Sequence, residues 1–166
     1  MKKISILIPC YNEQDNVHPI CAAVKKVLQE ELPAVPLAEP SLPRVKAIFN
    51  MKNFGQFNSP YYGLCQTTGD CTILLCCDFQ DPVELIPRMV HEWEQGHKVV
   101  AMIKTTSREN PILYFLRSCY YKLIHAMSSI EQIEHFTGFG LYDKSFIAVL
   151  RTLDDPTPFL RGIVAE

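Results

Sequence analysis

The chain has 166 residues, of which 48% are hydrophobic and 20% charged, and its formal net charge is -2 at pH 7. This length predicts a single domain, 1–166, with a core of its own, and the composition excludes a disordered chain. Near-neutral charge gives no reason to expect nucleic acid as a partner, because nucleic-acid binding usually requires a strongly basic face.

The cysteines and the apolar runs of the sequence give an expectation for the cellular compartment. The seven cysteines form no pair of Cys-x-x-Cys motifs and accompany no suitably spaced His pair, so a zinc site is not indicated. We expect reduced core thiols in a cytoplasmic protein. The start, "MKKISILIPCYNE", is better interpreted as a strand than as a signal peptide, and no run approaches the ~20 apolar residues of a transmembrane helix. We therefore expect a cytoplasmic chain without a membrane span, and leave open peripheral contact with the inner face of the membrane.

The first elements are a strand and a helix. Residues 4–9 form a continuous apolar run, which is typical of a strand covered on both faces. Apolar residues then recur at helical spacing over 17–28, with Asp15 or Asn16 as the cap and Pro19 in the first turn.

The next region is broken by proline. Residues 32–43 contain four prolines, which predict an irregular connector. A strand is expected over 44–50. A helix should follow, capped by Ser59, with Pro60 at its first position and Gly69 at its end.

Strands and helices continue to alternate through the rest of the chain. "CTILLCC" predicts a buried strand over 71–77, and Asp81 is the expected N-cap of a helix with Pro82 first and Glu84 as capping-box partner. The remaining expected elements are that helix, running to about residue 95, strands at 98–104 and 136–142, and helices at 111–127 and 143–153.

This alternation predicts an α/β domain with a mostly parallel sheet. In such sheets, ligands bind beyond the carboxyl ends of the strands. Two polar clusters, "YNE" at 11–13 and "DFQD" at 78–81, each follow a buried strand. We expect both at one edge of the sheet, as parts of one site.

The "DFQD" cluster presents hard oxygen ligands. The Asp78 carboxylate and the Gln80 carbonyl suit Mg²⁺ or Mn²⁺, completed by waters and substrate phosphates. The alternative is structural, with Asp81 capping a helix and Asp78 in a solvated loop. For Asp81 the structural interpretation is preferred; for Asp78 the spacing alone does not decide.

Three stretches carry a resemblance to a known family: "ISILIPCYNEQDNV", "GDCTILLCCDFQDPVELIP" and "FTGFGLYDK". Together they resemble family 2 glycosyltransferases of the GT-A fold, a three-layer α/β/α domain. The most similar branch transfers a sugar from a nucleotide sugar to a polyprenyl phosphate, as the bactoprenol and dolichol-phosphate enzymes of cell-envelope and glycan synthesis do. The resemblance covers nearly the whole chain, in the right order.

The resemblance implies roles for particular residues. It assigns nucleotide-sugar binding to the first motif and to the loop before the second helix, and the metal and donor diphosphate to the "DFQ" motif. Its implied donor is a nucleoside-diphosphate sugar, UDP-linked rather than GDP-linked, and its implied acceptor is a lipid phosphate. The implied nucleotide-sugar residues are Pro9, Tyr11, Glu13, Asn53, Gly55 and Asp78; the metal residues are Asp78 and Gln80; the catalytic residues are Asp78 and Arg161.

Three departures from the family pattern stand out. Relatives carry a second strand ending in an Asp-Asp-Gly-Ser-like motif, and the residues at 32–43 are too few and too proline-rich to supply it. One β-α unit is therefore expected to be missing, with the strand at 44–49 sliding against the first strand. Cys76 stands where the family has the leading carboxylate of its metal motif, and a thiol is a poor Mg²⁺ ligand. Relatives also continue beyond residue 166.

Two alternatives follow from these departures. The chain is either a working transferase or a non-catalytic domain of the same fold with an incomplete donor pocket. Segment 114–127 mixes aromatics with Arg117, Lys122 and His125. It is either a packed helix, which we prefer, or a face that meets lipid.

Overall fold

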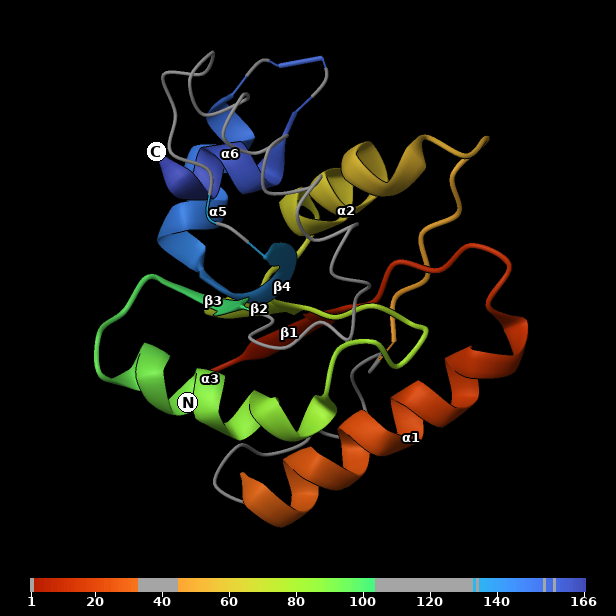
Figure 1. The fold of residues 1–166 in the computed structure, drawn as a ribbon, viewed down its shortest axis with the longest axis vertical. Coiled ribbons are helices and arrows are strands. Elements are labelled where there is room, and N and C mark those ends of the chain that lie inside the picture. Colours follow the sequence, from red (N-terminus) through yellow and green to blue (C-terminus); the bar gives the residue numbers. More distant parts are fainter. Residues whose placement is uncertain (1, 33–44, 104–132, 134, 154, 157) are drawn as a thin grey trace, which may run out of the picture.

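The computed structural model describes residues 2–32, 45–103, 133, 135–153, 155–156 and 158–166 (Figure 1). The predicted helix at 111–127, with the segment 114–127, and all of the connector except Leu32 lie outside these ranges. In chain order the elements are β1 (Ile4–Leu7), α1 (Gln14–Glu31), α2 (Gly55–Cys65), β2 (Cys71–Leu74), the 3-10 turn η1 (Val83–Leu85), α3 (Ile86–Glu94), β3 (Val99–Ile103), β4 (Phe136–Asp143), α5 (Lys144–Thr152) and α6 (Leu160–Ala165).

The described strands form one sheet in the order β1-β2-β4-β3. β1 pairs with β2 in parallel, whereas β4 is antiparallel to both of its neighbours, β2 and β3. Three of the four described strands therefore point in the same direction. The expected mostly parallel sheet is confirmed, with β4 as its antiparallel member.

Helices cover both faces of the sheet, which gives the expected three layers. In Figure 1, α1 and α3 lie on one face, and α2, α5 and α6 lie on the other. The strand period of two explains this. Cys71 and Ile73 of β2 pack in the cluster with α1 and α3, whereas Leu74 packs in the cluster with α2 and α5.

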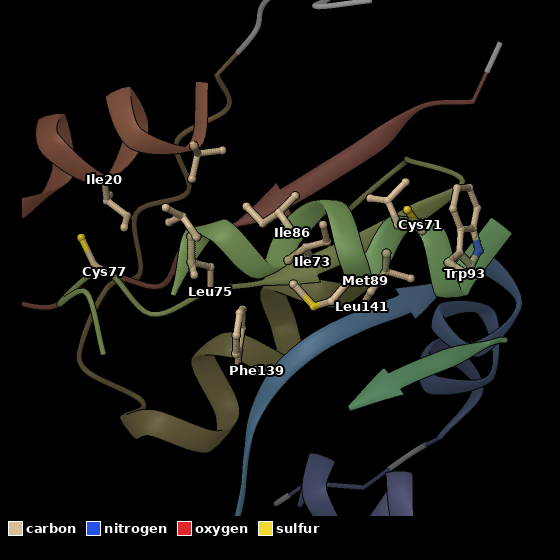
Figure 2. Packing of buried hydrophobic residues seen from close by; sticks show 13 residues of the cluster. Ile20, Cys71, Ile73, Leu75, Cys77, Ile86, Met89, Trp93, Phe139 and Leu141 are labelled. Atoms are coloured by element: carbon tan, nitrogen blue, oxygen red, sulfur yellow. The ribbon is translucent and has the colours of Figure 1, made fainter. Parts of the chain in front are cut away.

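The larger cluster joins α1 and α3 to the sheet. Figure 2 shows its side chains converging from α1, β2, α3 and β4. Met89 of α3 and Leu141 of β4 are fully buried, and both belong to this cluster. Its labelled members are Ile20, Cys71, Ile73, Leu75, Cys77, Ile86, Met89, Trp93, Phe139 and Leu141.

The strand expected at 44–50 is wrong over its described part. Residues 45–50 form no strand and are exposed throughout, so they neither slide against β1 nor close the sheet. The composition of this segment favours a strand, but composition alone does not make one. A strand forms only where a neighbouring strand pairs with its backbone hydrogen-bonding groups. The next helix, α2, begins at Gly55 rather than at Pro60, so Ser59 lies inside it and is not its cap, and it ends at Cys65 rather than at Gly69.

Two further expected helix caps are also wrong. α1 begins before Asp15 and Asn16, its N-cap residue is Glu13, and no side chain caps it. Asp81 caps no helix. Its carboxylate is buried and accepts a hydrogen bond from the Cys76 amide at 3.0 Å. α3 begins at Ile86, after the 3-10 turn.

The cysteines are free thiols in the described chain, but few of them are core residues. Cys71 and Cys77 are buried, whereas Cys10, Cys21 and Cys76 are exposed. Small apolar neighbours in sequence did not reveal which thiols face solvent. None of the helices in the described ranges combines the length and apolar character that crossing a bilayer requires.

Asp143 fastens the end of β4 to α3. Its carboxylate accepts hydrogen bonds from Trp93 Nε1 at 2.7 Å and from the Ser145 amide at 2.9 Å, and Lys98 Nζ lies 3.6 Å away. Burial by itself would raise the pKa of Asp143. The hydrogen bonds from Ser145 and Trp93 and the Lys98 charge outweigh it and lower the pKa to about 2.

We expect Asp143 to make stability pH-dependent. Because its pKa in the folded protein is below the ordinary 3.8, its contribution of about 2 kcal/mol is fully present above that value and is lost as pH falls toward 2. Urea unfolding of the wild type and of Asp143→Asn between pH 5 and pH 2 checks this. The difference in their free energies of unfolding should shrink as the pH falls; a constant difference would contradict the assignment.

Candidate functional site

The two polar loops leave the sheet side by side. Leu7 and Leu74 end the parallel strands β1 and β2 and are partners in register. The amide of Leu75 donates to the carbonyl of Leu7 at 3.0 Å, which extends the pairing by one residue. Residues 8–13 and 75–81 therefore start together at what we call the carboxyl edge of the sheet. This confirms that the two clusters share one edge.

The first loop carries Pro9, Tyr11 and Glu13. Tyr11 is 66% exposed, whereas Pro9 and Glu13 are half-buried. The Glu13 carboxylate accepts a hydrogen bond from Asn16 Nδ2 at 2.6 Å, and the Glu13 carbonyl accepts the first amides of α1. The start of α1 thus fixes Glu13, while Tyr11 extends into solvent.

The second loop carries Asp78 and Gln80. Both residues are exposed. The backbone amide of Gln80 donates a hydrogen bond to Asp78 Oδ1 at 3.1 Å, so the Asp78 carboxylate is held against the backbone of its own turn. The Asp81–Cys76 hydrogen bond closes the same loop from inside. Asp78 therefore sits on a braced turn that presents its carboxylate to solvent.

Each loop also contains a residue in the left-handed region of backbone space. Asn12 has φ 57 and Phe79 has φ 59, in the middle of the "YNE" and "DFQ" motifs. A bulky residue such as Phe reaches this region at a cost of roughly 1–3 kcal/mol, which the surrounding structure must offset. Such residues cluster at functional sites, so their presence in both loops supports a site at this edge.

Cys77, in the second loop, has a buried thiol. Burial, and then a hydrogen bond with the Cys10 thiol, raise the pKa of the Cys77 thiol to about 12. Cys77 follows β2 and Cys10 follows β1. With its pKa raised, the Cys77 thiol stays protonated at neutral pH, whereas a metal ligand would have to be the thiolate.

Arg161 reaches the same edge from α6. Its guanidinium stacks on the rings of Phe57 and Phe159, at 5.3 and 5.2 Å from their centroids, and Nη1 donates to the Phe136 carbonyl at 3.4 Å. Phe136 begins β4, which is antiparallel and so starts at the carboxyl edge. The structure thus places a fixed positive charge at the edge to which the two loops belong.

Asn53 and Gly55 lie four and two residues before Phe57, whose ring contacts Arg161. The Gly55 amide donates to Asn53 Oδ1 at 2.7 Å at the start of α2. Two residues later, Phe57 packs edge-on against Phe159, with centroids 5.6 Å apart, and contacts Arg161. α2 therefore brings the exposed Asn53 and Gly55 to the Arg161 side of the edge.

Sequence reasoning did not find the two phenylalanines that hold Arg161. Phe57 and Phe159 are about a hundred positions apart; Phe159 opens the "FLRG" stretch that contains Arg161, but neither ring was a candidate. Single aromatic residues are common in cores. No spacing signal in the sequence could have paired them, because only the packing of α2 against the C-terminal segment does.

The carboxyl edge alone is a weak cation site. Among the described residues, no three His, Cys, Asp or Glu side chains gather where they could hold a metal ion. Cys76, at the position of the family's leading carboxylate, is exposed. Mg²⁺ commonly takes one or two carboxylates and completes its shell with substrate phosphates and water. Asp78 and Gln80 fit that arrangement only if a diphosphate is bound as well.

A cavity of about 310 Å³ lies away from this edge, lined by Thr67, Thr68, Gly69, Lys144, Ile147 and Arg151. Both of its cations are already engaged. Lys144 pairs with Asp70 at 2.8 Å, and Arg151 donates to the carbonyls of Cys65 and Thr67. We do not place the site there.

Known proteins of similar sequence are named as sugar transferases. An uncharacterized glycosyltransferase of Bacillus subtilis is 30% identical over 179 residues, covering 97% of this chain and 55% of its own. The bactoprenol glucosyl transferase of Shigella phage SfX is 26% identical (98% and 59%). The undecaprenyl-phosphate 4-deoxy-4-formamido-L-arabinose transferase of Photorhabdus laumondii is 34% identical (76% and 43%). No protein-family profile matches.

Two features of these matches show how much of its relatives' sequence this chain contains. The chain spans 43% to 59% of the length of these relatives. The match to the Bacillus subtilis protein extends over 179 residues, more than the 166 of the chain. That relative therefore carries residues, inside the matched region, that this chain lacks.

Proposed function

The chain is a glycosyltransferase-like protein related to the polyprenyl-phosphate sugar transferases, and on that premise we propose that it transfers a sugar from a nucleoside-diphosphate sugar to a lipid phosphate. The observation that carries the proposal is the convergence at the carboxyl edge of the sheet. Two braced polar loops begin at this edge. Arg161, packed against two aromatic rings, hydrogen-bonds the start of β4 at the same edge.

The donor would lie across this edge. Tyr11 and Glu13 on one side, and Asn53 and Gly55 on the other, are the proposed contacts of the nucleoside, with Pro9 shaping the turn between strand and loop. Tyr11 offers an exposed aromatic face for a base. We expect a UDP-sugar rather than a GDP-sugar.

Asp78 and Gln80 would hold Mg²⁺ or Mn²⁺ together with the donor diphosphate. A bound divalent ion supplies Lewis-acid stabilisation of the leaving diphosphate. The braced turn keeps Asp78 in place before ligand arrives, which lowers the entropic cost of binding.

Arg161 would hold phosphate charge. A guanidinium remains charged at all relevant pH values and binds phosphate in two-point geometry. The rings of Phe57 and Phe159 restrict its movement, so little freedom remains to be lost on binding.

The reaction itself is a direct displacement. An oxygen of the acceptor phosphate forms a bond to the anomeric carbon while the bond to the donor diphosphate breaks, and the nucleoside diphosphate leaves with the electron pair. A phosphomonoester has a second pKa of ~6, so the acceptor is anionic at neutral pH. The site must position it and screen charge, and it requires no general base.

Calorimetric titration with UDP, GDP and Mn²⁺ tests the proposal. We expect Mn²⁺ alone to give no measurable heat of binding, because one carboxylate and one amide bind it weakly. UDP should bind at least tenfold more tightly with Mn²⁺ than without, and more tightly than GDP. Transfer from a UDP-sugar to undecaprenyl phosphate is the assay that follows.

The opposite result has a definite meaning. If a chain shown to be folded by circular dichroism binds neither nucleotide, with or without Mn²⁺, the transferase proposal fails. The alternative of a non-catalytic domain of the same fold would then hold. Binding of UDP without any effect of Mn²⁺ would reject the metal-assisted mechanism alone.

A further inference from the structure

β1 leaves one row of backbone groups without a strand partner in the described chain. The carbonyls of Lys3 and Leu7 accept amides from the β2 side, at 2.6 Å from Asp70 and 3.0 Å from Leu75. Backbone groups in a parallel pair alternate in direction from residue to residue. Those of Ile4 and Ile6 therefore point to the other edge, where the described residues supply no strand.

The sequence of β1 does not suit an edge position. Apart from Ser5 it is entirely apolar, which is typical of strands with neighbours on both sides. All four of its residues are only half-buried, whereas all four residues of β2 are buried. Exposed edge strands are usually protected by charge, proline or a bulge, and β1 has none of these.

A second apolar feature lies in residues 45–50, the segment that was expected to be a strand. We call it the apolar strip. Phe49 is 92% exposed, Val45 78% and Ile48 41%, and Lys46 is the only charged residue among them. Met51, just beyond, is fully exposed. Contiguous exposed apolar side chains of this kind mark an interaction surface.

We propose that a second copy of this chain covers both features: the apolar strip of each copy adds a strand to the β1 edge of the other. The chain carries both halves of the interaction, a β-prone donor segment and an acceptor edge that no described strand covers, and the two are not paired within one copy. A reciprocal exchange about a two-fold axis satisfies both edges at once.

The charge and the sequence pattern of the apolar strip favour a second copy of the chain as its partner. Val45, Ala47 and Phe49 alternate with Lys46, Ile48 and Asn50, so one face of an added strand would be wholly apolar, matching the apolar β1. One lysine on each strip gives little repulsion between copies. This inference does not depend on the proposed function.

The test is the oligomeric state of the full chain, measured by sedimentation equilibrium over a wide concentration range. We expect a reversible dimer. Phe49→Asp should weaken dimerisation at least tenfold, because a charge would have to be buried. Val149→Asp is the matched control, since Val149 is also an exposed apolar residue (53%) but lies on α5. It should dimerise like the wild type.

Two proline variants separate strand addition from unspecific apolar contact. Consecutive amides of a strand point to opposite sides, so Ala47→Pro or Ile48→Pro must remove a donor that faces the partner. At least one of the two should dissociate the dimer. Both residues are outside the core, and circular dichroism should show that both variants fold.

Several results would overturn the inference. A wild type that stays monomeric at all concentrations would do so, as would a dimer that survives Phe49→Asp or both proline variants. Equal weakening by Val149→Asp would point to unspecific association. A monomer that binds anionic lipid vesicles, and loses this binding in Phe49→Asp, would reject the inference and assign the strip to a lipid surface.

Discussion

Asp78→Asn is expected to lower the rate of sugar transfer about 100-fold or more, and to abolish the effect of Mn²⁺ on UDP binding. The substitution keeps the shape of the side chain and an oxygen that accepts the Gln80 amide, so the turn should stay intact. It removes the negative charge that the proposed metal site requires. A 100-fold loss corresponds to about 2.7 kcal/mol of transition-state stabilisation, the size expected for one charged group at a site of charge development.

Glu84→Gln is the control for this variant. Glu84 is an exposed carboxylate in the 3-10 turn six positions further along the chain, and the same chemical change there should leave transfer and nucleotide binding unaffected. If Asp78→Asn transferred sugar at the wild-type rate, Asp78 would be the solvated loop residue of the structural interpretation, and the metal would have to bind elsewhere or play no part.

Gly140→Ala should reduce the free energy of unfolding by about 3 kcal/mol, at the upper end of the usual cost of inserting a methyl group into a packed region. Gly140 lies in β4 opposite Leu74 of β2 and Ala101 of β3. A Cβ there would lie 2.5 Å from the Val100 carbonyl oxygen and 3.4 Å from Ala101 Cα. These are backbone atoms, which cannot rotate away.

Thermal unfolding followed by circular dichroism measures this effect. For a domain of this size, 3 kcal/mol corresponds to a fall in Tm of roughly 6–12 °C. Thr137→Ala is the control, because Thr137 is an exposed residue of the same strand and should change Tm by no more than a degree or two. A Gly140→Ala variant as stable as the wild type would show that β4 does not run this close to β3.

Local patterns predicted most of the elements correctly. The apolar runs of β1, β2 and β3 and the helical spacing of α1, α3 and α5 are signals carried by adjacent residues, and each element is found near its expected place. Shared strand direction then placed "YNE" and "DFQD" at one edge, since parallel strands end together. This step required no knowledge of side-chain contacts.

The errors concern features that depend on distant partners. Residues 45–50 have strand composition, but a strand requires a neighbour, and the sequence does not say whether one is present. Asp81 has the features of an N-cap, yet it hydrogen-bonds the Cys76 amide five residues earlier. Local rules do not decide between two backbone partners for one carboxylate.

The site was predicted only in part, because some of its contacts also depend on residues distant in sequence. Asp78 and Gln80 belong to one short motif, so their hydrogen-bonded turn follows from sequence neighbours. The setting of Arg161 does not, because one of its two aromatic rings, Phe57, comes from about a hundred positions earlier in the chain. The resemblance to a family supplied Arg161, and the packing explains how it is held.

The hydrogen bond between Trp93 and Asp143 has an optical consequence. Trp93 is the only tryptophan of the chain and is 92% shielded from solvent, so its fluorescence reports on one place alone. That place is the junction of α3 with the last residue of β4, beside Cys71, the first residue of β2. It is at the opposite end of the sheet from the nucleotide loops. Emission should therefore report unfolding clearly and remain constant when a nucleotide binds. A spectral change on adding UDP would mean that the whole sheet responds to its ligand.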